Sequence, residues 1–348
     1  MQLLLHKIKE AYKNKLPFVS YNKPNETTVR GLFQKDASLN TITSGFNEPG
    51  FVFAPFNTTD TTVFFPLDQS DFVKATYVDL QIEFNHTQQL KSPSKKSHIT
   101  IVEKAVSAIK NNEFKKVVIS RKEILSLSGV DVEEIYMRLL KLYPNAFVYV
   151  WFHPLIGLWF GATPETLLKV ENNNFTTMSL AGTQVYKKNE EVIWNPKEIE
   201  EQQIVTEYIL HKLSKFSTNL EQSKTKTVKA GSLLHLSTEI KGKLLNKELF
   251  SLVDLLHPTP AVCGFPKDKA KQYILENENY NRSYYTGYLG ELNMESDSDS
   301  HLFVNLRCME IRDYKAAIYV GGGITHDSNP EKEWEETVAK SNVMLKVL

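Results

Sequence analysis

Cysteine is nearly absent from this sequence, which has only Cys263 and Cys308 among its 348 residues. Two cysteines make no disulfide framework, and this pair lacks the short spacings that bind metals. Few and unpaired cysteines are typical of a reduced compartment, so we expect a cytoplasmic protein.

Net charge and long hydrophobic runs are also missing. The 41 lysines and arginines balance 41 aspartates and glutamates, whereas a dedicated nucleic-acid binder needs a basic excess to neutralise phosphates. Near the N-terminus, only Leu3–Leu5 are apolar before charged residues interrupt. That run is too short for a signal-peptide core, and no stretch approaches a membrane span. We therefore expect neither a nucleic-acid partner nor a membrane.

Two segments far apart in the chain repeat one acidic pattern: Asn195-Pro-Lys-Glu-Ile-Glu-Glu201 and Asn329-Pro-Glu-Lys-Glu-Trp-Glu-Glu336. In each, Asn and Pro predict a helix N-terminus. At helical spacing, Glu198 and Glu201 share one face, as do Glu333 and Glu336. Two such helix starts could converge on a hard divalent cation, which takes oxygen ligands.

A simpler reading of both segments stays open. Glutamate in a first helical turn is favoured by the helix dipole, and Glu198 could complete a capping box with Asn195. Yet each segment follows a β-like run that ends in glycine, at 177–183 and at 317–323. This repetition favours two pseudo-symmetric halves that face one site.

The remaining patterns predict an α+β fold. Runs rich in Phe, Thr and Val predict mainly strands over residues 17–85, and residues 91–97 predict an exposed connector. Helices are expected at about 98–112, 132–142, from 196, near 246–256, 267–279 and at the C-terminus, and strands at 116–121, 146–180, 227–241, 284–294, 301–311 and 315–322. Strands joined by short turns favour antiparallel sheets with helices packed outside.

Lys116 lies in a β-branched run, Phe114–Arg121, that predicts a strand. Alternation puts Lys115 and Lys116 on opposite faces, so one of them points toward the core or a cleft. A lysine held in a dehydrated site can lose its proton and act as a general base. The alternative is an exposed lysine on an edge strand, and this segment alone favours that alternative.

Glu165 follows a turn sequence, Gly161-Ala-Thr-Pro164, at the end of an apolar run. A carboxyl group beside apolar walls can stay protonated and serve as a general acid. A turn carboxylate in water is an equally open reading.

Three further features carry functional chemistry. The proline-rich loop His257–Pro266 either shapes a pocket wall or fixes a chain crossing, and composition does not choose between them. Arg307 is expected to share a strand face with Phe303, where an inward arginine needs an acidic partner such as a carboxylate ligand. Lys340 is expected to form an i, i+4 salt bridge with Glu336.

The motifs follow one order along the chain: Lys116-Val-Val-Ile-Ser-Arg121, Gly161-Ala-Thr-Pro-Glu165, Leu180-Ala-Gly-Thr183, Lys197-Glu-Ile-Glu-Glu201, His257-Pro-Thr-Pro-Ala261, Leu306-Arg-Cys308, and Gly321-Gly-Gly-Ile-Thr325 with Glu333-Trp-Glu-Glu-Thr337. In this set the chain resembles the chorismate-binding enzyme family, which contains isochorismate, salicylate, anthranilate and aminodeoxychorismate synthases. The resemblance implies one chorismate-utilising domain, 1–348, with a variable part, 1–96, and a catalytic part, 97–348. It also implies two large antiparallel sheets packed at a steep angle, with outer helices and a deep central cleft.

The same resemblance implies a magnesium site and a substrate site. Mg²⁺ would be held mainly by Glu201 and Glu336, with Glu198 and Glu333 holding its waters, and would bind the ring carboxylate of chorismate. The residues implied for substrate binding are Gly182, Thr183, His235, Ala261, Tyr285, Arg307, Gly321, Gly323 and Lys340.

Three positions imply isochorismate synthase within the family. Ammonia-using members have glutamine in place of Lys116, aminodeoxychorismate synthases have lysine in place of Ala181, and pyruvate-expelling members tend to have threonine in place of Ala261. In the implied reaction, Lys116 takes a proton from a water aimed at ring carbon C2, and Glu165 gives a proton to the departing C4 hydroxyl.

Two residues depart from the family pattern: Gln202 stands where histidine is usual, and Thr163 where serine is commoner. A salicylate synthase and a non-catalytic chorismate-binding protein are the alternatives to isochorismate synthase. We expect a monomer that has chorismate as its small-molecule partner and needs no glutaminase subunit. The choice between menaquinone and siderophore biosynthesis depends on neighbouring enzymes.

Overall fold

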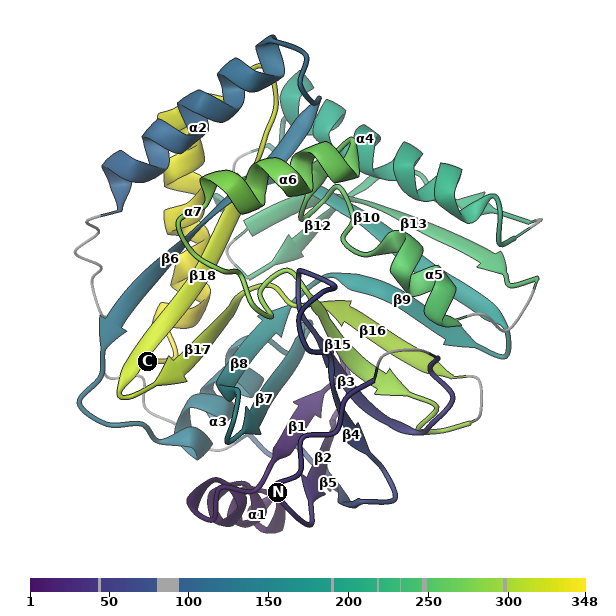
Figure 1. The fold of residues 1–348 in the computed structure, drawn as a ribbon, viewed down its shortest axis with the longest axis vertical. Helices are drawn as coiled ribbons and strands as arrows, with labels where there is room; N and C mark the ends of the chain where they lie inside the picture. Colours follow the sequence, from purple (N-terminus) through teal and green to yellow (C-terminus); the bar gives the residue numbers. More distant parts are fainter. Residues whose placement is uncertain are drawn as a thin grey trace.

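The computed structural model describes residues 1–42, 45–79, 94–188, 191–217, 219–231, 233–245, 249–296 and 299–348. Part of the predicted connector, residues 91–93, and the start of the predicted helix 246–256 lie outside these ranges. Figure 1 shows strands forming the centre of the molecule and helices around them.

Two antiparallel sheets contain the strands of the described residues. The order of the first sheet is β14 (Gly264–Phe265), β6 (Lys116–Ser126), β18 (Lys315–Ile324), β17 (Cys308–Arg312), β8 (Gly157–Thr163), β7 (Phe147–His153), β1 (Phe18–Asn22), β2 (Thr28–Gln34) and β5 (Ser70–Thr76). The order of the second is β11 (Glu221–Gln222), β13 (Leu233–Lys243), β10 (Asn174–Val185), β9 (Thr166–Glu171), β16 (Ser300–Val304), β15 (Tyr288–Leu292), β3 (Gly50–Ala54) and β4 (Val63–Pro66), with β12 (Lys226–Ala230) also paired to β13. The predicted α+β fold with two large antiparallel sheets is confirmed.

The helices of the described residues are α1 (Gln2–Lys13), α2 (Lys95–Lys110), α3 (Val132–Leu142), α4 (Pro196–Leu213), α5 (Leu249–Leu256), α6 (Lys267–Asn277) and α7 (Pro330–Leu345). The helix predicted at 132–142 is confirmed as α3, whose N-cap Asp131 accepts a bond from the backbone N–H of Glu134. None of these helices is long and apolar enough to cross a membrane.

The N-terminal strands are built into both sheets. In the first sheet β1 pairs with β7, and in the second β3 pairs with β15, so strands from the variable part lie beside strands from the catalytic part. Aromatic side chains of both sheets pack together between them: Phe53 of β3 lies 4.7 Å from Trp151 of β7, between ring centroids. The early strands therefore complete the core that the later strands begin.

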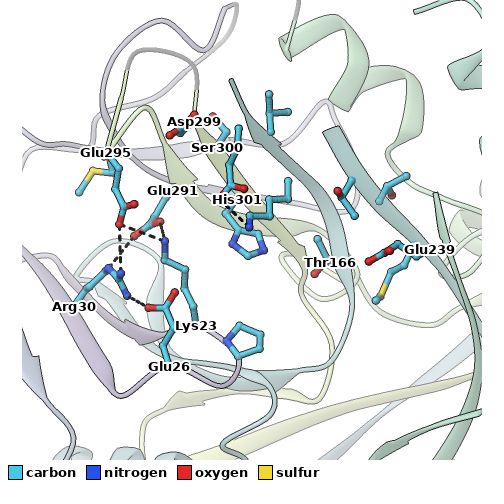
Figure 2. A pocket seen from close by; sticks show the side chains of 18 residues that line it. Lys23, Glu26, Arg30, Thr166, Glu239, Glu291, Glu295, Asp299, Ser300 and His301 are labelled. Atoms are coloured by element: carbon cyan, nitrogen blue, oxygen red, sulfur yellow. Dashed lines mark hydrogen bonds and ion pairs between the residues drawn. The ribbon is translucent and has the colours of Figure 1, made fainter. Parts of the chain in front are cut away.

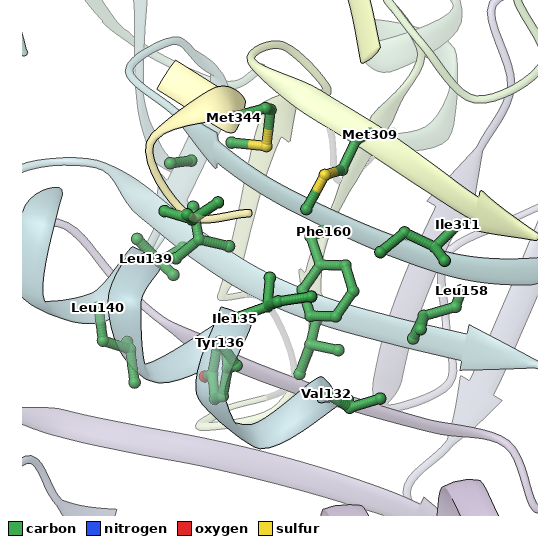
Figure 3. Close-up of a cluster of buried hydrophobic side chains, with 14 of the residues drawn as sticks. Val132, Ile135, Tyr136, Leu139, Leu140, Leu158, Phe160, Met309, Ile311 and Met344 are labelled. Atoms are coloured by element: carbon green, nitrogen blue, oxygen red, sulfur yellow. The ribbon is translucent and has the colours of Figure 1, made fainter. Parts of the chain in front are cut away.

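The outer face of the first sheet is covered by α3 and the end of α7. Ile135 and Leu139 of α3 meet Phe160 of β8 and Met309 of β17, and Met344 of α7 closes the cluster (Figure 3). Burying a side chain of this size stabilises the fold by roughly 1.5–3 kcal/mol. This packing fixes α7, and so the acidic turn at its start, against β18.

One sequence prediction about the strands is wrong. Residues 301–311 were expected to form a single strand, but β16 belongs to the second sheet and β17 to the first. The chain changes sheets between them, and Arg307 adopts a positive φ of 47° at this crossing. Apolar alternation continues through the crossing because both strands are buried, so the pattern does not reveal the break.

Candidate active site

A cavity lies where the glycine ends of β10 and β18 meet the acidic helices α4 and α7. Its lining includes most of the predicted site residues: Glu165, Gly182, Thr183, Glu201, His235, Ala261, Tyr285, Arg307, Gly321, Gly323 and Lys340. The first half of the acidic repeat contributes Glu201 to this lining, and α7 contributes Lys340, which lies beyond the second half. The two acidic helix starts themselves meet through Lys197 and Glu333.

Two glycines allow the acidic helices to approach the strands. A Cβ on Gly323 would overlap the carboxylate of Glu201 and lie 3.1 Å from Cε of Lys116. Gly182 has a φ of 74°, and a Cβ there would lie 3.1 Å from the Glu198 backbone oxygen. The pairing of β10 with β13 shifts by one residue at Gly182, which marks a bulge.

Lys116, rather than Lys115, is the inward lysine of β6. Its side chain is fully buried, and its Nζ lies 3.1 Å from Oε1 of Glu201. The two groups form an ion pair, but the angles between them are not those of a hydrogen bond. Nζ of Lys116 therefore has no hydrogen-bond partner in the described residues. The reading of Lys116 as an exposed edge lysine is wrong, because its side chain lies behind Gly323 of β18 and faces Glu201 of α4.

Glu165 is buried at the turn between β8 and β9. Its backbone N–H donates to Oγ1 of Thr163 at 3.3 Å, so threonine supplies the hydroxyl of the turn. Burial raises the pKa of Glu165 from its ordinary 4.5 to about 8, against the lowering influence of Lys116, Arg307 and Lys340. The carboxyl is therefore protonated at neutral pH, and the reading of Glu165 as a solvated turn residue is wrong.

Arg307 enters the cavity beside His235. Burial lowers the pKa of His235 to about 3, with Arg307 and Lys340 adding to the effect, so the ring is neutral. Nη2 of Arg307 lies 3.2 Å from Nε2, and Nδ1 lies 3.1 Å from the carbonyl oxygen of Gly182. A neutral ring meets both contacts only by accepting at Nε2 and donating at Nδ1. Thr183 places its hydroxyl 3.3 Å from Nδ1.

The predicted strand face for Arg307 and Phe303 has to be corrected. Phe303 lies on β16 and packs between the sheets, whereas Arg307 lies at the crossing outside either strand. The positive φ of Arg307 turns its side chain out of the strand alternation. In the described residues no carboxylate forms an ion pair with it, which leaves it available to an anionic ligand.

The proline-rich loop shapes a wall of the cavity, because its Ala261 and Val262 are lining residues. Tyr285 stands on another wall and stacks on Tyr319 with ring centroids 5.4 Å apart. A Cβ on Gly321 would lie 3.0 Å from the Tyr285 hydroxyl. The open reading of the proline-rich loop is thereby decided in favour of a pocket wall.

The four predicted metal-binding glutamates lie in two environments. Glu201 and Glu333 are buried, and Glu336 is largely so. Glu198 is half-buried, and its Oε2 accepts the backbone N–H of Asn195 at 3.0 Å. For Glu198 the simpler helix-capping interpretation is therefore present in the structure.

Each of the other three carboxylates faces a lysine. Lys116 pairs with Glu201, Lys197 with Glu333, and Lys340 with Glu336 at 2.5 Å, as expected for the last pair. Lys340 also donates to the carbonyl oxygen of Gly321 at 2.9 Å.

Glu333 and Glu336 have divergent acidities. Burial raises the pKa of Glu333 to about 7, and the neighbouring charge of Glu336 adds to the rise. Burial also acts on Glu336, but Lys340 and Lys197 outweigh it and hold its pKa below the ordinary value. Glu333 and Glu336 are thus two neighbouring carboxylates whose pKa values are shifted in opposite directions.

The acidic side chains suit a hard cation by donor type. Carboxylate oxygens are the ligands that Mg²⁺ takes, and Oε2 of Glu333 is buried without a hydrogen-bond partner. As they stand, however, no three His, Cys, Asp or Glu side chains of the described ranges are arranged to hold a metal. The carboxylates point to lysines instead. The type of donor atom therefore suits Mg²⁺, whereas the present arrangement is that of three ion pairs.

Sequence reasoning missed Lys197. Its side chain is 18% exposed and contacts Glu333, which links α4 to α7. A lysine in the first turn of a helix opposes the helix dipole, and this misplaced charge was the available signal. Sequence reasoning also gave no role to Gln202, whose Nε2 lies 2.8–2.9 Å from the hydroxyls of Ser179, Thr206 and Thr238 and so ties α4 to β10 and β13.

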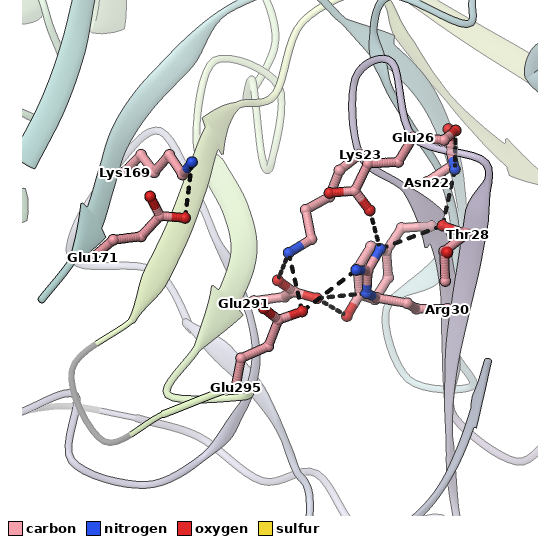
Figure 4. Close-up of polar contacts among 10 residues, drawn as sticks. Asn22, Lys23, Glu26, Thr28, Arg30, Lys169, Glu171, Glu291 and Glu295 are labelled. Carbon is pink, nitrogen blue, oxygen red and sulfur yellow. Dashed lines mark hydrogen bonds and ion pairs between the residues drawn. The ribbon is translucent and has the colours of Figure 1, made fainter.

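A second cavity, of about 400 Å³, lies elsewhere, between the ends of β9, β15 and β16 and the turn after β1 (Figure 2). Its wall carries a buried ion network in which Glu291 binds Lys23 at 2.6 Å and the Tyr21 hydroxyl at 2.6 Å, with Arg30 and Glu295 beside it (Figure 4). Here the buried acid and base neutralise each other directly. This network therefore resembles a structural ion cluster more than a catalytic pair.

The cavity at the acidic helices has room for only about 60 Å³. Pockets for drug-sized ligands hold roughly 300–1,000 Å³. A substrate therefore has to displace the side-chain contacts that fill the site, such as those of Arg307 with His235 and of Lys340 with Glu336.

Comparison with known proteins gives consistent matches. Residues 68–348 match the family model described as chorismate binding enzyme. The isochorismate synthase EntC of Escherichia coli strain K12 is 30% identical over 276 residues, which are 76% of this chain and 70% of that protein. A Bacillus anthracis protein assigned as the 2,3-dihydroxybenzoate-specific isochorismate synthase DhbC superposes with a TM-score of 0.83, 25% identity and 99% coverage of both chains. The menaquinone-specific isochorismate synthase MenF of E. coli has the same fold, with a TM-score of 0.80, 20% identity, and coverage of 95% of this chain and 88% of that one.

Proposed function

Because the chain belongs to the chorismate-binding enzyme family, we propose that it is an isochorismate synthase. The proposed reaction is a Mg²⁺-dependent isomerisation of chorismate to isochorismate. A water molecule adds at ring carbon C2 while the C4 hydroxyl leaves, so one hydroxyl is gained and one is lost.

The observation that carries the proposal is a protonated acid that lines the cavity, together with a buried lysine that faces Glu201, another lining residue. Glu165, with its pKa near 8, holds a proton that it can give to a leaving hydroxyl. Lys116 is buried and forms an ion pair with Glu201, and in the proposed reaction it is the group that deprotonates water. Acid and base chemistry of this kind needs two groups whose environments keep them in opposite protonation states.

The proton path balances with these two residues. Lys116 accepts a proton from the attacking water as the neutral amine, which requires that Glu201 no longer be its ion-pair partner. Glu165 donates its proton to the C4 oxygen, which leaves as water. The next turnover requires a proton to return from Lys116 to Glu165 through solvent.

The remaining residues orient the substrate. Chorismate carries two carboxylates, and among the described lining residues Arg307 and Lys340 are the two cations. Arg307 can exchange its neutral partner His235 for a charged carboxylate, which forms the stronger bond. Holding the ring between acid and base is the kind of positioning that contributes most to a unimolecular rearrangement.

The metal of the proposal would be held by Glu201 and Glu336, with Glu198 and Glu333 near its waters. Bound there, Mg²⁺ would supply positive charge for the ring carboxylate of chorismate. The unpartnered buried oxygen of Glu333 supports this assignment.

Three side chains support this member of the family over its relatives. Lys116 stands in the position that would select water as nucleophile, and Ala181 and Ala261 line the cavity without adding a polar group.

A salicylate synthase, which would also expel pyruvate, is the alternative activity. Relatives named as menaquinone-specific and vibriobactin-specific support a role in supplying isochorismate to one of these routes.

The experiment is product chromatography from purified protein and chorismate, with and without Mg²⁺, and with a coupled assay for pyruvate. Isochorismate formed only with Mg²⁺, without stoichiometric pyruvate, is the expected result. Stoichiometric pyruvate would replace the proposal with salicylate synthase. Chorismate binding without any product would indicate a binding protein.

A further inference from the structure

We propose that Lys197 is a built-in counter-charge that joins the two acidic helices when no divalent cation is bound and weakens the binding of that cation. This inference rests on the proposed metal site. It assigns a function to a residue that takes no part in the acid, base or carboxylate-binding roles proposed above.

The contacts of Lys197 place its charge among the acidic side chains. Its ammonium group contacts the buried Glu333, whose side chain is 2% exposed. Lys197 belongs to α4 while Glu333 and Glu336 belong to α7, so this ion pair joins the two acidic helices.

Lys197 differs from the other two lysines of the site. Lys340 lines the cavity, and Lys116 reaches behind Gly323 to Glu201, which are both lining residues. Lys197 is not a lining residue, and neither is its partner Glu333. Its charge meets the carboxylates from the side of the helix starts, where it can act on a cation without touching the substrate.

The internal repeat supplies a matched comparison. In the alignment that places Glu198 on Glu333, Lys197 corresponds to Lys332 of α7. Lys332 is exposed, so the two halves have a lysine at the same motif position but bury only one. An inward lysine in the first turn of α4 opposes the helix dipole, and its pairing with Glu333 offsets that cost.

A divalent cation among the same carboxylates would lie close to this ammonium group. Like charges a few ångströms apart at an effective dielectric constant near 20 repel by more than the ~1.4 kcal/mol that equals a tenfold change in affinity. Removing the charge of Lys197 should therefore tighten cation binding at least about tenfold. It should also loosen the metal-free protein, because Glu333 loses its partner.

The test compares the wild type, Lys197→Met and the matched control Lys332→Met. Titration calorimetry measures the dissociation constant of Mg²⁺ at one fixed pH for all three proteins, and thermal unfolding measures the melting temperature with and without Mg²⁺. We expect Lys197→Met to bind Mg²⁺ about tenfold more tightly or better, to melt lower without the metal, and to gain more on its addition. Lys332→Met should match the wild type in all three measurements.

Equal or weaker Mg²⁺ binding by Lys197→Met would overturn the inference while leaving the proposed activity intact, provided that the wild type binds Mg²⁺ and forms isochorismate. A wild type without any Mg²⁺ binding, with or without chorismate, would overturn both.

A second pair of variants covers the case in which Lys197→Met does not fold. Glu333→Gln and the double variant Glu333→Gln with Lys197→Met differ by the same lysine, but the double variant leaves no buried carboxylate unpaired at position 333. The double variant is expected to bind Mg²⁺ about tenfold more tightly than Glu333→Gln alone. Equal affinities of these two proteins would contradict the role of Lys197.

Discussion

Substitution of Glu165 by glutamine removes the proposed catalytic proton while keeping the size and hydrogen-bonding ability of the side chain. Glu165 is buried, and burial raises its pKa to about 8. General acids contribute roughly 10²–10⁴ to reaction rates, so kcat for isochorismate formation should fall by a factor in that range. KM should change little, because the amide still fills the site.

The pH dependence of the wild type gives the second part of this prediction. Only the protonated carboxyl donates, so kcat/KM should fall as the pH rises through about 8. The residual activity of Glu165→Gln should lack this alkaline limb. Initial rates measured by chromatography over the same pH range for both proteins provide the assay.

The stability of the wild type should also fall as the pH rises. The unfolded chain releases the Glu165 proton near 4.5, whereas the folded protein keeps it up to about 8. The stability that this proton contributes is full below pH 4.5 and is lost as the pH rises to about 8. Glu165→Gln does not titrate, so its free energy of unfolding should gain on that of the wild type across this window, by on the order of a few kcal/mol.

Glu171→Gln is the matched control, because Glu171 lies at the end of the next strand and is exposed beside Lys169. Its rate, pH profile and stability should equal those of the wild type. A Glu165→Gln protein with more than about a tenth of the wild-type kcat would refute the assignment of the acid. An alkaline limb that survives the substitution would refute it as well.

Three further predictions follow from the same contacts. Lys116→Ala should lower kcat by at least about 10²-fold while calorimetry still detects chorismate binding; near-normal turnover would place the base elsewhere. Gly323→Ala should weaken Mg²⁺ activation severely, because the new Cβ would overlap Glu201, whereas Gly129→Ala, with no atom within 4 Å of the added carbon, should leave it unchanged. Arg307→Lys should raise KM by about tenfold or more, because one carboxylate loses a bidentate partner; an unchanged KM would remove Arg307 from the substrate site.

Local patterns predicted the elements that carry their own start signals. The helix at 132–142 begins at an aspartate cap, and the acidic helices begin at Asn-Pro, so their positions could be read from a few neighbouring residues. The strand over 301–311 could not be resolved in the same way. Both of its parts are buried, and the crossing between sheets at Arg307 depends on which strands lie beside them.

The candidate site was predictable as a set of residue types but not as a set of contacts. Strand alternation placed Lys115 and Lys116 on opposite faces without showing which face is covered, and the residues that lie against Lys116, Glu201 and Gly323, come from distant parts of the chain. The protonation of Glu165 likewise depends on burial by distant segments. In both cases the deciding quantity is desolvation, which the neighbouring sequence does not contain.

The charges of the site show why carboxylates and lysines have to be considered together. Glu201, Glu333 and Glu336 would repel one another in a buried site, and three lysines offset that repulsion in the metal-free protein. Two of these lysines, Lys116 and Lys340, have proposed work to do on water and on substrate, so they must leave their carboxylates during turnover. A divalent cation that takes over the carboxylates would release both at once. The acidic cluster proposed to bind the metal would then also free the base, which links metal dependence to proton transfer without a direct contact between the metal and the base.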